Sequence, residues 1–346
     1  MVRKALFIFL FFISIQLFSQ TNYHIRTVAF YNLENLFDTE DDPETLDETS
    51  PIMEIQENRE EVYQQKLNNM ANVIAGIGTK EAKNSPVILG VAEVENLKVL
   101  EDLIHTDSLK NKNYSIIHYN SPDKRGIDVA LLYQSHFFKP THHETFELRL
   151  WDTDGSRIYT RYQLLVSGYL DGELIHVIVN HWPSRRGGEA ESSFKREKAA
   201  YLTKQIIEKI KLTDSNPKVI IMGDLNDDPT NKSLKEVLQT KAKKADVKEN
   251  DLYNPMEDMF RRGEHTLVYR DQINLFDQII ISAPLLTTKK EFLTYKMYKA
   301  GVYNPQYITT QTGKFKGYPY RSFARSGFLG GYSDHYPVYM YLIKED

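Results

Sequence analysis

Short apolar runs recur along the chain, and several of them stop abruptly at polar residues. In the stretch VIIMGDLNDDP, residues 219–229, four apolar residues precede Gly223, and Asp224, Asn226, Asp227 and Asp228 follow it. A short apolar run that ends at glycine is typical of a buried strand. Carboxylates crowded at the end of such a strand repel one another unless a cation neutralises them, and a hard divalent cation prefers oxygen ligands of this kind. Asp, Asn and Pro are also ordinary turn residues, so this stretch alone leaves a metal site and a plain turn open.

The same arrangement of an apolar strand with a polar end occurs at five further places. Asn32 and Glu34 follow the apolar run at residues 27–31, and Glu93 and Glu95 follow the run at residues 87–92. Asn180 and His181 follow the run at residues 176–179. Two others have the reverse order, with Asp277 ahead of residues 279–281 and Ser333, Asp334 and His335 ahead of residues 338–342. If the reversed strands run antiparallel to the others, all six polar clusters lie on one rim of a sandwich of sheets. We therefore expect a single site built from strand ends.

These motifs resemble those of the endonuclease/exonuclease/phosphatase superfamily, the DNase I-like metal-dependent phosphoesterases. The matching stretches, in the order of that family, are NLEN with Asn32, VAEVEN with Glu93, VNHWPS with His181, GDLN with Asp224 and Asn226, FDQIII with Asp277, and SDHYPV with Asp334 and His335. They span residues 26–342, nearly the whole chain. GDxN and SDHxP are moderate signals individually, whereas six motifs in order are a strong one. The resemblance implies an α+β fold of four layers, in which two packed mixed or antiparallel sheets are flanked by helices.

The rest of the pattern predicts many strands and few helices, which by itself favours two packed sheets with helices outside. Helices are expected at residues 60–77, 97–104, 189–210 and 232–238. Further strands are expected at residues 24–31, 86–91, 114–119, 127–133, 157–166, 173–179, 272–282 and 337–343. Residues 36–58 are expected to form an acidic loop, and no regular element is predicted for residues 239–265 or 283–332. Because repeats and Pro/Ser-rich linkers are absent from the sequence, we expect one domain over residues 21–346.

Residues 1–20 have the pattern of a secretory signal peptide. Arg3 and Lys4 precede a mostly apolar segment at residues 5–17, which is too short to span a bilayer. Phe18 and Gln20 are larger than cleavage sites prefer, so a retained N-terminal anchor is the alternative. We expect an exported protein, periplasmic or secreted, whose mature chain begins near Thr21 and has no stable membrane span. The chain has no cysteine, which excludes disulfides, thiolate metal ligands and a cysteine nucleophile.

Charge is distributed unevenly along the chain. The formal net charge is −4, but residues 38–61 contain eleven acids and one arginine and so carry −10. Residues 21–37 and 62–346, which lie outside both this acidic segment and residues 1–20, together carry +4. This mild positive excess suits an anionic substrate, but it is too small to predict tight nucleic-acid binding. The acidic segment is interpreted as a solvated loop, with a Ca²⁺ site as the alternative.

Phosphate ester hydrolysis needs a metal, a base for water, an acid for the leaving oxygen and donors for the developing charge. Glu93 is the first candidate to hold Mg²⁺ or Mn²⁺, and Glu95 is its rival because residues two apart on a strand share a face. The resemblance favours Glu93 and implies metal roles for Asn32 and Asp334. Whether one or two metals bind is left open.

Two histidines are the candidates for acid–base chemistry. A histidine ordinarily titrates near neutral pH, so His335 is a candidate to take a proton from water, and the resemblance implies that Asp277 orients it. The resemblance places His181 opposite, in contact with the phosphate and able to protonate the leaving group, with Asp128 considered as its carboxylate partner. Asp224 and Asn226 are expected to contact the attacking water, the phosphoryl oxygens or the metal, and the sequence does not separate these alternatives.

Two basic segments are candidates for substrate binding. Arg185 and Arg186 follow His181 in HWPSRRGG, and residues 313–332 place Arg321 and Arg325 among aromatic residues with no acid. Cations among aromatics are typical of surfaces that hold single strands, although a loop packed by its own tyrosines or one that touches a membrane has the same composition. We therefore expect an exported, monomeric, metal-dependent phosphodiesterase that acts on nucleic acid. The alternatives are a sphingomyelinase-type phospholipase C, a sugar or inositol phosphatase, and a non-catalytic binding protein of the same fold.

Overall fold

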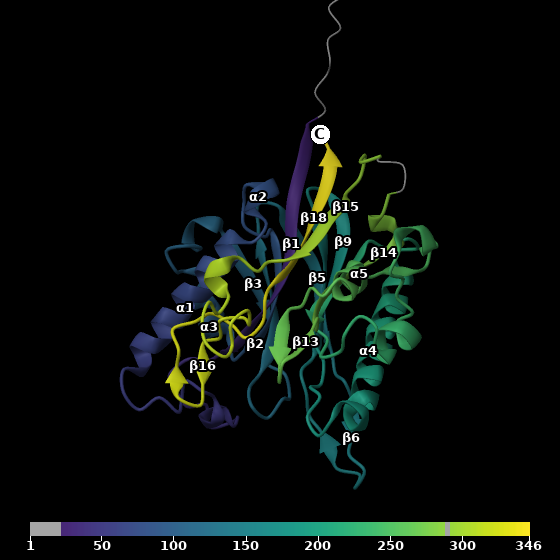
Figure 1. Cartoon of the computed structure of the whole chain (residues 1–346). Coiled ribbons are helices and arrows are strands. Elements are labelled where there is room, and N and C mark those ends of the chain that lie inside the picture. Colours follow the sequence, from purple (N-terminus) through teal and green to yellow (C-terminus); the bar gives the residue numbers. More distant parts are fainter. Residues whose placement is uncertain (1–21, 288–290) are drawn as a thin grey trace, which may run out of the picture.

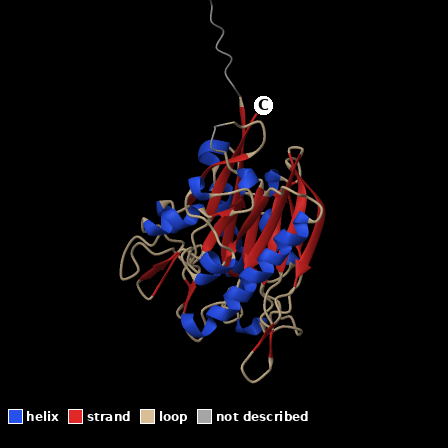
Figure 2. Cartoon of the chain, turned by 90° about the vertical axis from the view of Figure 1, so that its right-hand side faces the viewer, coloured by secondary structure: helices blue, strands red, loops and turns tan. Residues whose placement is uncertain are grey.

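Two six-stranded sheets pack face to face in the computed structural model, which describes residues 22–287 and 291–346 (Figure 1). Helices α1 (Arg59–Gly76) and α3 (Leu97–Ile104) cover the outer face of one sheet, and α4 (Glu189–Lys211) covers the other. Figure 2 shows α4 running across the strands of its sheet. The predicted four-layer α+β sandwich is therefore confirmed. The predicted signal peptide lies outside the described residues.

The first sheet contains both ends of the described chain. Its strands, in spatial order, are β15 (Lys296–Val302), β18 (Val338–Glu345), β1 (Tyr23–Leu36), β2 (Ile88–Val94), β4 (Asp128–Gln134) and β3 (Tyr114–His118). The second sheet has the order β11 (Leu252–Tyr253), β14 (Asp277–Ser282), β10 (Val219–Asp224), β9 (Glu173–His181), β8 (Gln163–Leu170) and β5 (Phe138–Phe146). Three two-stranded hairpins are β6 (Leu150–Trp151) with β7 (Arg157–Ile158), β12 (Leu267–Tyr269) with β13 (Gln272–Asn274), and β16 (Phe323–Ala324) with β17 (Gly327–Phe328).

The two strands whose polar residues come first in the sequence run antiparallel to their neighbours, as the reversed motifs predicted. β1 and β2 are parallel, as are β9 and β10, so their polar ends lie at the same edge. β18 runs antiparallel to β1 and β14 runs antiparallel to β10, so the polar residues that precede these two strands reach that edge as well. The opposite edge holds the chain ends, where Tyr23 pairs with Glu345, at the top of Figure 1.

The core between the sheets is built by two-residue alternation along each strand. In β1, Val28 and Phe30 face the second sheet, whereas Ala29 and Tyr31 face the helices. Gly90 lets the sheets approach closely, because a Cβ there would lie 2.6 Å from the sulfur of Met222 on the facing strand. The other inward residues are mostly Val, Ile, Leu and Met from both sheets, and they form one continuous cluster.

Several segments differ from the sequence-based expectation. The predicted strand at residues 157–166 is split, since Arg157–Ile158 pairs within a hairpin and β8 begins only at Gln163. The predicted strand at residues 272–282 breaks after Asn274, because the Leu275 amide donates to the Asp228 carboxylate instead of continuing the ladder.

Other segments contain elements that the sequence did not indicate. β5 is an edge strand with the polar sequence FKPTHHETF, so it lacks an apolar pattern. Helix α5 (Pro255–Arg261) and strand β15 lie in segments with no predicted element. Helix α5 does have a local start signal, since the Asn254 side chain accepts from the Met256 amide and Pro255 occupies the first turn. The short helix α2 (Thr79–Ala82) was not predicted either. None of the helices in the described ranges is long and apolar enough to cross a bilayer.

Candidate active site

The polar strand ends meet at the edge opposite the chain ends. Asp224 is the register partner of His181 on β9 and of Asp277 on β14. Asn32 is on the same face of β1 as Val28 and Phe30, so its side chain points toward the second sheet. The Asn32 amide donates to a Glu93 oxygen at 3.2 Å and to an Asp224 oxygen at 3.2 Å, which joins the two sheets at the rim.

A backbone irregularity directs Glu93 to this rim. Leu89 and Val91 pack on the helix side of β2, and regular alternation would place Glu93 on that side too. The ladder shifts register between Ala92 and Val94, and Glu93 adopts a left-handed φ of 58°, which turns its side chain toward Asn32. Its second oxygen accepts from the Asn35 amide at 3.0 Å.

Glu95, the rival candidate, belongs to a different cluster. Its carboxylate accepts from the Asp38 amide at 2.7 Å. Burial raises the pKa of Glu95 to about 8, with a further contribution from the charges of Asp38, Asp47 and Asp42. The geometry therefore places Glu93, and not Glu95, among the rim residues.

Glu93, His181 and Asp224 could together hold a metal ion. Each has a ligand atom within 4.8 Å of those of the other two, and His181 Nε2 lies 3.8 Å from Glu93 and 3.6 Å from Asp224. Burial raises the pKa of Asp224 to about 7, the His335 charge opposes the rise, and the charges of Asp277 and Glu93 add to it. Two carboxylates this close in a buried position fit a hard divalent cation, which would neutralise both.

His335 is held by the carboxylate predicted to orient it. Its Nδ1 lies 2.7 Å from Asp277 Oδ2, and the Asp277 side chain is fully buried. Burial lowers the pKa of His335, but the charges of Asp277, Asp224 and Asp334 outweigh this effect and place it well above its ordinary value. Since Nδ1 is engaged, Nε2 is the atom left to face the rim, 4.0 Å from Asp334.

His181 lacks the carboxylate partner that the sequence suggested. Asp128 instead bonds to His118 at 2.9 Å and to the Ser121 amide at 2.7 Å, so that assignment is wrong. The Nδ1 atom of His181 is buried and has no hydrogen-bond partner in the described parts of the chain. Burial lowers the pKa of His181 well below its ordinary value, and the charges of Arg161 and Arg125 lower it further.

Asp334 and Asn226 occupy the margins of the site. The Asp334 carboxylate accepts from Arg321 at 3.1 Å and lies outside the group formed by Glu93, His181 and Asp224, so its metal role stays a prediction. Asn226 has a left-handed φ of 50°, and its side-chain amide donates to the Trp182 carbonyl at 3.0 Å. Asn226 therefore fastens the segment after His181 to the end of β10.

Sequence reasoning missed two charged groups around the rim. Arg161 donates to the Trp182 carbonyl at 2.6 Å and pairs with Asp123 at 3.1 Å, and Arg125 pairs with the same Asp123 carboxylate. These two arginines place positive charge beside His181. The only local signal was the SPDKRG turn at residues 121–126, between the predicted strands 114–119 and 127–133.

The second missed group is Glu34 with Lys66. The Glu34 carboxylate accepts from the Ser322 amide at 2.6 Å and from Arg321 at 3.3 Å, while the Lys66 ammonium donates to the Ser322 hydroxyl at 2.9 Å. Burial and the charge of Asp334 raise the pKa of Glu34 to about 7. Glu34 thus anchors the basic segment 313–332 beside the rim. The only sequence feature that could have indicated this role is the position of Glu34 within the NLEN motif.

The four predicted substrate-binding arginines differ in what they contact. The Arg185 guanidinium donates to the Asn226 carbonyl at 2.9 Å and lies 4.4 Å from the Phe276 ring centre, so it links loops within the protein. Arg321 donates to the carboxylates of Glu34 and Asp334. Across residues 22–287 and 291–346, the guanidinium groups of Arg186 and Arg325 make no hydrogen bond or ion pair, and both side chains are exposed.

A pocket of about 660 Å³ lies beside Asn226, between residues 184–189 and the β12–β13 hairpin. Its wall includes Arg186, Tyr269, Arg270 and Phe276. With Arg185, it therefore presents three arginines and two aromatic rings next to the strand-end residues.

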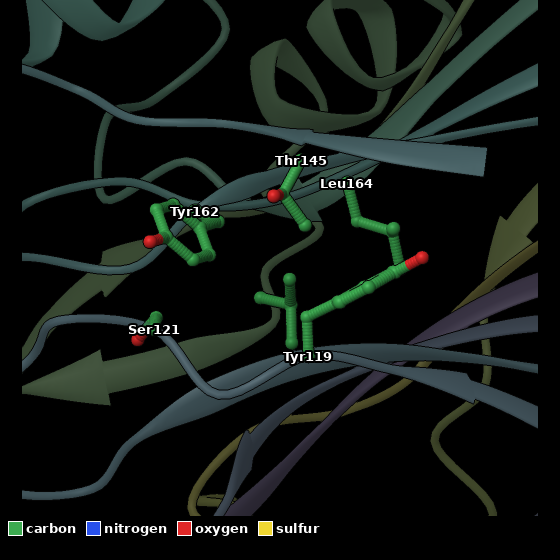
Figure 3. A pocket seen from close by; sticks show the side chains of 6 residues that line it. Tyr119, Ser121, Thr145, Tyr162 and Leu164 are labelled. Carbon is green, nitrogen blue, oxygen red and sulfur yellow. The ribbon is translucent and has the colours of Figure 1, made fainter.

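A second depression lies between the edge strands of the two sheets (Figure 3). Tyr119, Ser121, Val129, Thr145, Tyr162 and Leu164 line it. It contains no charged side chain and so lacks the groups that phosphate ester hydrolysis requires.

Replacing Glu95 with glutamine should flatten the dependence of stability on pH. The folded-state pKa of about 8 lies above the ordinary value, so Glu95 contributes full stability below pH 4.5, and this contribution is lost as pH rises toward 8. One such group changes the free energy of unfolding by at most about 1.4 kcal/mol per pH unit. Urea denaturation from pH 5 to pH 8 with EDTA checks this. Equal slopes in wild type, Glu95→Gln and the exposed control Glu101→Gln would contradict it.

Comparisons with known proteins agree with this architecture. The model of the Endonuclease/Exonuclease/phosphatase family matches residues 27–344. A crystal structure of an endonuclease/exonuclease/phosphatase family protein from Bacteroides thetaiotaomicron has a TM-score of 0.54 and 17% identity, covering 94% of this chain and 97% of that one. The mannosyl-6-phosphatase from Bacteroides thetaiotaomicron has a TM-score of 0.52 and 17% identity, covering 92% and 99%.

A third similar structure contains nucleic acid. D. rerio TDP2 complexed with single strand DNA product has a TM-score of 0.50 and 11% identity, covering 92% of this chain and 98% of that one. At these identities the likeness concerns the fold alone. A comparison with curated proteins gives no match.

Proposed function

Because this chain belongs to the endonuclease/exonuclease/phosphatase family of phosphoester hydrolases, we propose that it is a divalent-metal-dependent phosphodiesterase that cleaves nucleic acid. The observation that carries the proposal is the joining of the two sheets at one rim by Asn32, Glu93 and Asp224, with His181 and the His335–Asp277 pair beside them. Glu93, His181, Asp224 and Asp277 lie at strand ends and Asn32 lies within β1, so the rigid sandwich, and not a mobile loop, positions most of these groups.

Each group has a chemical task in this proposal. Glu93 and Asp224, the two carboxylates of the group that also contains His181, would hold Mg²⁺ or Mn²⁺ with Asn32 beside them, which leaves His181 for the substrate. The ion, when bound, withdraws charge from the phosphoryl oxygens. Asp277 holds His335 through Nδ1, so His335 exchanges protons or donates a hydrogen bond through Nε2. His181 presents Nε2 to the same space from the second sheet, and the nearby guanidinium groups of Arg125 and Arg161 add positive charge for an anionic substrate.

Nucleic acid is the proposed substrate because cations and aromatic rings flank the rim. The pocket beside Asn226 offers Arg186 and Arg270 for phosphates and the exposed ring of Tyr269 for a base. Arg325 lies in the turn between β16 and β17, within the segment 313–332 that Glu34 anchors. The TDP2 structure with a single strand DNA product supports this substrate class. Because a mannosyl-6-phosphatase is also similar in structure, a sugar phosphate is the second candidate substrate.

We further propose that the protein is exported and acts as a monomer with one domain over residues 21–346. The signal peptide pattern at residues 1–20 supports export, and the continuous core between the two sheets supports a single domain. The localisation follows from the N-terminal pattern alone and is independent of the proposed chemistry.

A substrate panel tests the proposed function. Single-stranded DNA, RNA, sphingomyelin vesicles, mannose 6-phosphate and an inositol phosphate are each incubated with the full chain in Mg²⁺ or Mn²⁺. We expect DNA or RNA to be cleaved and the other three to remain intact. Release of inorganic phosphate from a sugar phosphate with both nucleic acids intact would instead make the protein a sugar phosphatase.

Removing the pocket arginines should weaken substrate binding while sparing the chemical step. Arg186→Ala and Arg270→Ala should each raise KM for an oligonucleotide about tenfold, which corresponds to about 1.4 kcal/mol, with kcat little changed. Each lost phosphate contact should also reduce the salt dependence, by about 0.7 in the slope of log K against log salt. Steady-state kinetics at several salt concentrations measure both quantities.

Lys139→Ala is the matched control. Lys139 is exposed at the start of β5, next to the turn that precedes β9 and therefore at the far end of the sandwich. Its removal changes the net charge equally without touching the pocket. If all three variants change KM alike, the effect is one of net charge and the pocket does not bind the substrate.

A further inference from the structure

The first part of the acidic segment, residues 38–48, forms a loop that is folded against the body of the protein. The Leu46 amide donates to the Lys124 carbonyl at 2.7 Å, so this loop packs on the turn that carries Arg125. Asp47 lies within it and is only 1% exposed. A solvated loop, the favoured interpretation of the sequence, would leave this carboxylate in water.

Three carboxylates converge in this loop. Asp41, Asp47 and Glu48 each have an oxygen within 4.8 Å of those of the other two. One oxygen of Asp47 accepts from the Asp42 amide at 2.9 Å, but the other, Oδ1, is buried and has no hydrogen-bond partner. A buried carboxylate oxygen without a partner costs free energy, because it has lost its water and gained nothing in exchange.

Cationic side chains do not neutralise this cluster. In the described ranges, no lysine, arginine or histidine forms an ion pair with Asp41, Asp47 or Glu48. Lys98 lies 3.9 Å from Asp38, and the guanidinium of Arg59 donates to backbone carbonyls. The negative charge at Asp47 is therefore uncompensated within the protein.

We propose that Asp41, Asp47 and Glu48 bind a structural Ca²⁺ ion, with the buried Asp47 as its central ligand. Ca²⁺ accepts six to eight oxygen ligands in flexible geometry, which suits an irregular loop supplying carboxylates, carbonyls and water. Mg²⁺ demands near-octahedral geometry, and softer metals prefer nitrogen or sulfur ligands, which side chains of this loop do not offer. The site is separate from the rim and does not depend on the proposed phosphodiesterase activity.

Bound Ca²⁺ would act on stability and on loop order. An ion that binds only the folded chain raises the melting temperature by mass action. It would also hold the acidic loop against the turn at Lys124, and so help to position Arg125 beside the rim.

Calorimetric titration of CaCl₂ into the full chain carrying Glu93→Gln tests the proposal, because this background weakens the rim site. We expect one Ca²⁺ per chain with a Kd of about 10⁻⁵–10⁻³ M, and a rise in melting temperature that saturates with the same Kd. Adding Asp47→Asn should abolish both signals. Adding Glu44→Gln, an exposed acid of the same loop outside the cluster, should leave both unchanged.

A second variant keeps the test decisive if Asp47→Asn misfolds. Asp41 and Glu48 are exposed, so Asp41→Asn/Glu48→Gln should fold normally by circular dichroism and still weaken Ca²⁺ binding at least about tenfold. The proposal is overturned if no Ca²⁺ binds at about 10 mM, well above the weak end of protein affinities. It is also overturned if Glu44→Gln weakens binding as much as the double variant, or if Mg²⁺ binds as tightly as Ca²⁺.

Discussion

Replacing Glu93 with glutamine should reduce kcat for phosphodiester hydrolysis by at least about a hundredfold, as expected when a major charge-stabilising group is lost. Glu93 is the rim carboxylate that the bulge in β2 redirects toward Asn32 and His181. Glutamine keeps the size and the hydrogen-bonding oxygen but removes the charge that binds a cation. The substitution should therefore weaken metal binding together with catalysis, and titration with Mn²⁺ should show the loss directly.

Glu95→Gln is the matched control, two residues further along the chain and just past the end of β2. Its carboxylate faces the acidic cluster and accepts from the Asp38 amide, so the variant should keep kcat within a few-fold of wild type. Loss of activity in Glu95→Gln with normal activity in Glu93→Gln would reverse the assignment of the metal ligand.

Replacing His335 with alanine should lower kcat by about 10²–10⁴-fold, the usual contribution of a single acid–base group. The His335 ring is anchored by Asp277 at 2.7 Å, and its free Nε2 faces the rim. Circular dichroism and the melting temperature establish that the variant is folded. The exposed His142→Ala should keep wild-type kcat.

The Asp277→Asn variant separates the charge of the pair from its geometry. The Asp277 charge is the largest of the effects that raise the pKa of His335, so its loss should lower that pKa. The limb of the pH–rate profile that reports His335 should then move to lower pH, while the loss of kcat should be smaller than in His335→Ala. An unchanged pH profile, or normal turnover without the His335 ring, would remove the pair from the mechanism.

The rim could be predicted from the sequence because it depends on a local rule. Apolar strands that end in polar residues, with two of the patterns reversed, place Asn32, His181, Asp224 and Asp277 together once the reversed strands are antiparallel. The choice between Glu93 and Glu95 could not be made from alternation. It depends on one residue of left-handed backbone and a register shift, which the residue pattern does not reveal.

The surroundings of the rim depend on contacts between distant segments. Glu34 binds the backbone of Ser322, and Arg185 binds the carbonyl of Asn226, although nothing near either residue in the sequence indicates its partner. Arg185 was expected at the substrate for the same reason that it can pack inside the protein: a guanidinium serves phosphate, carboxylate, carbonyl and aromatic partners alike. Local chemistry identified the residue types, and the fold decided which arginines remain free.

Cleavage of a 5′-labelled single-stranded oligonucleotide, with the products resolved by length, tests the central claim most directly. The account predicts internal phosphodiester cleavage by the wild-type chain in Mg²⁺ or Mn²⁺, no cleavage in excess EDTA, and at least about a hundredfold slower cleavage by Glu93→Gln. An oligonucleotide left intact by the wild-type chain in both metals, or cleaved at full rate in EDTA, would contradict it.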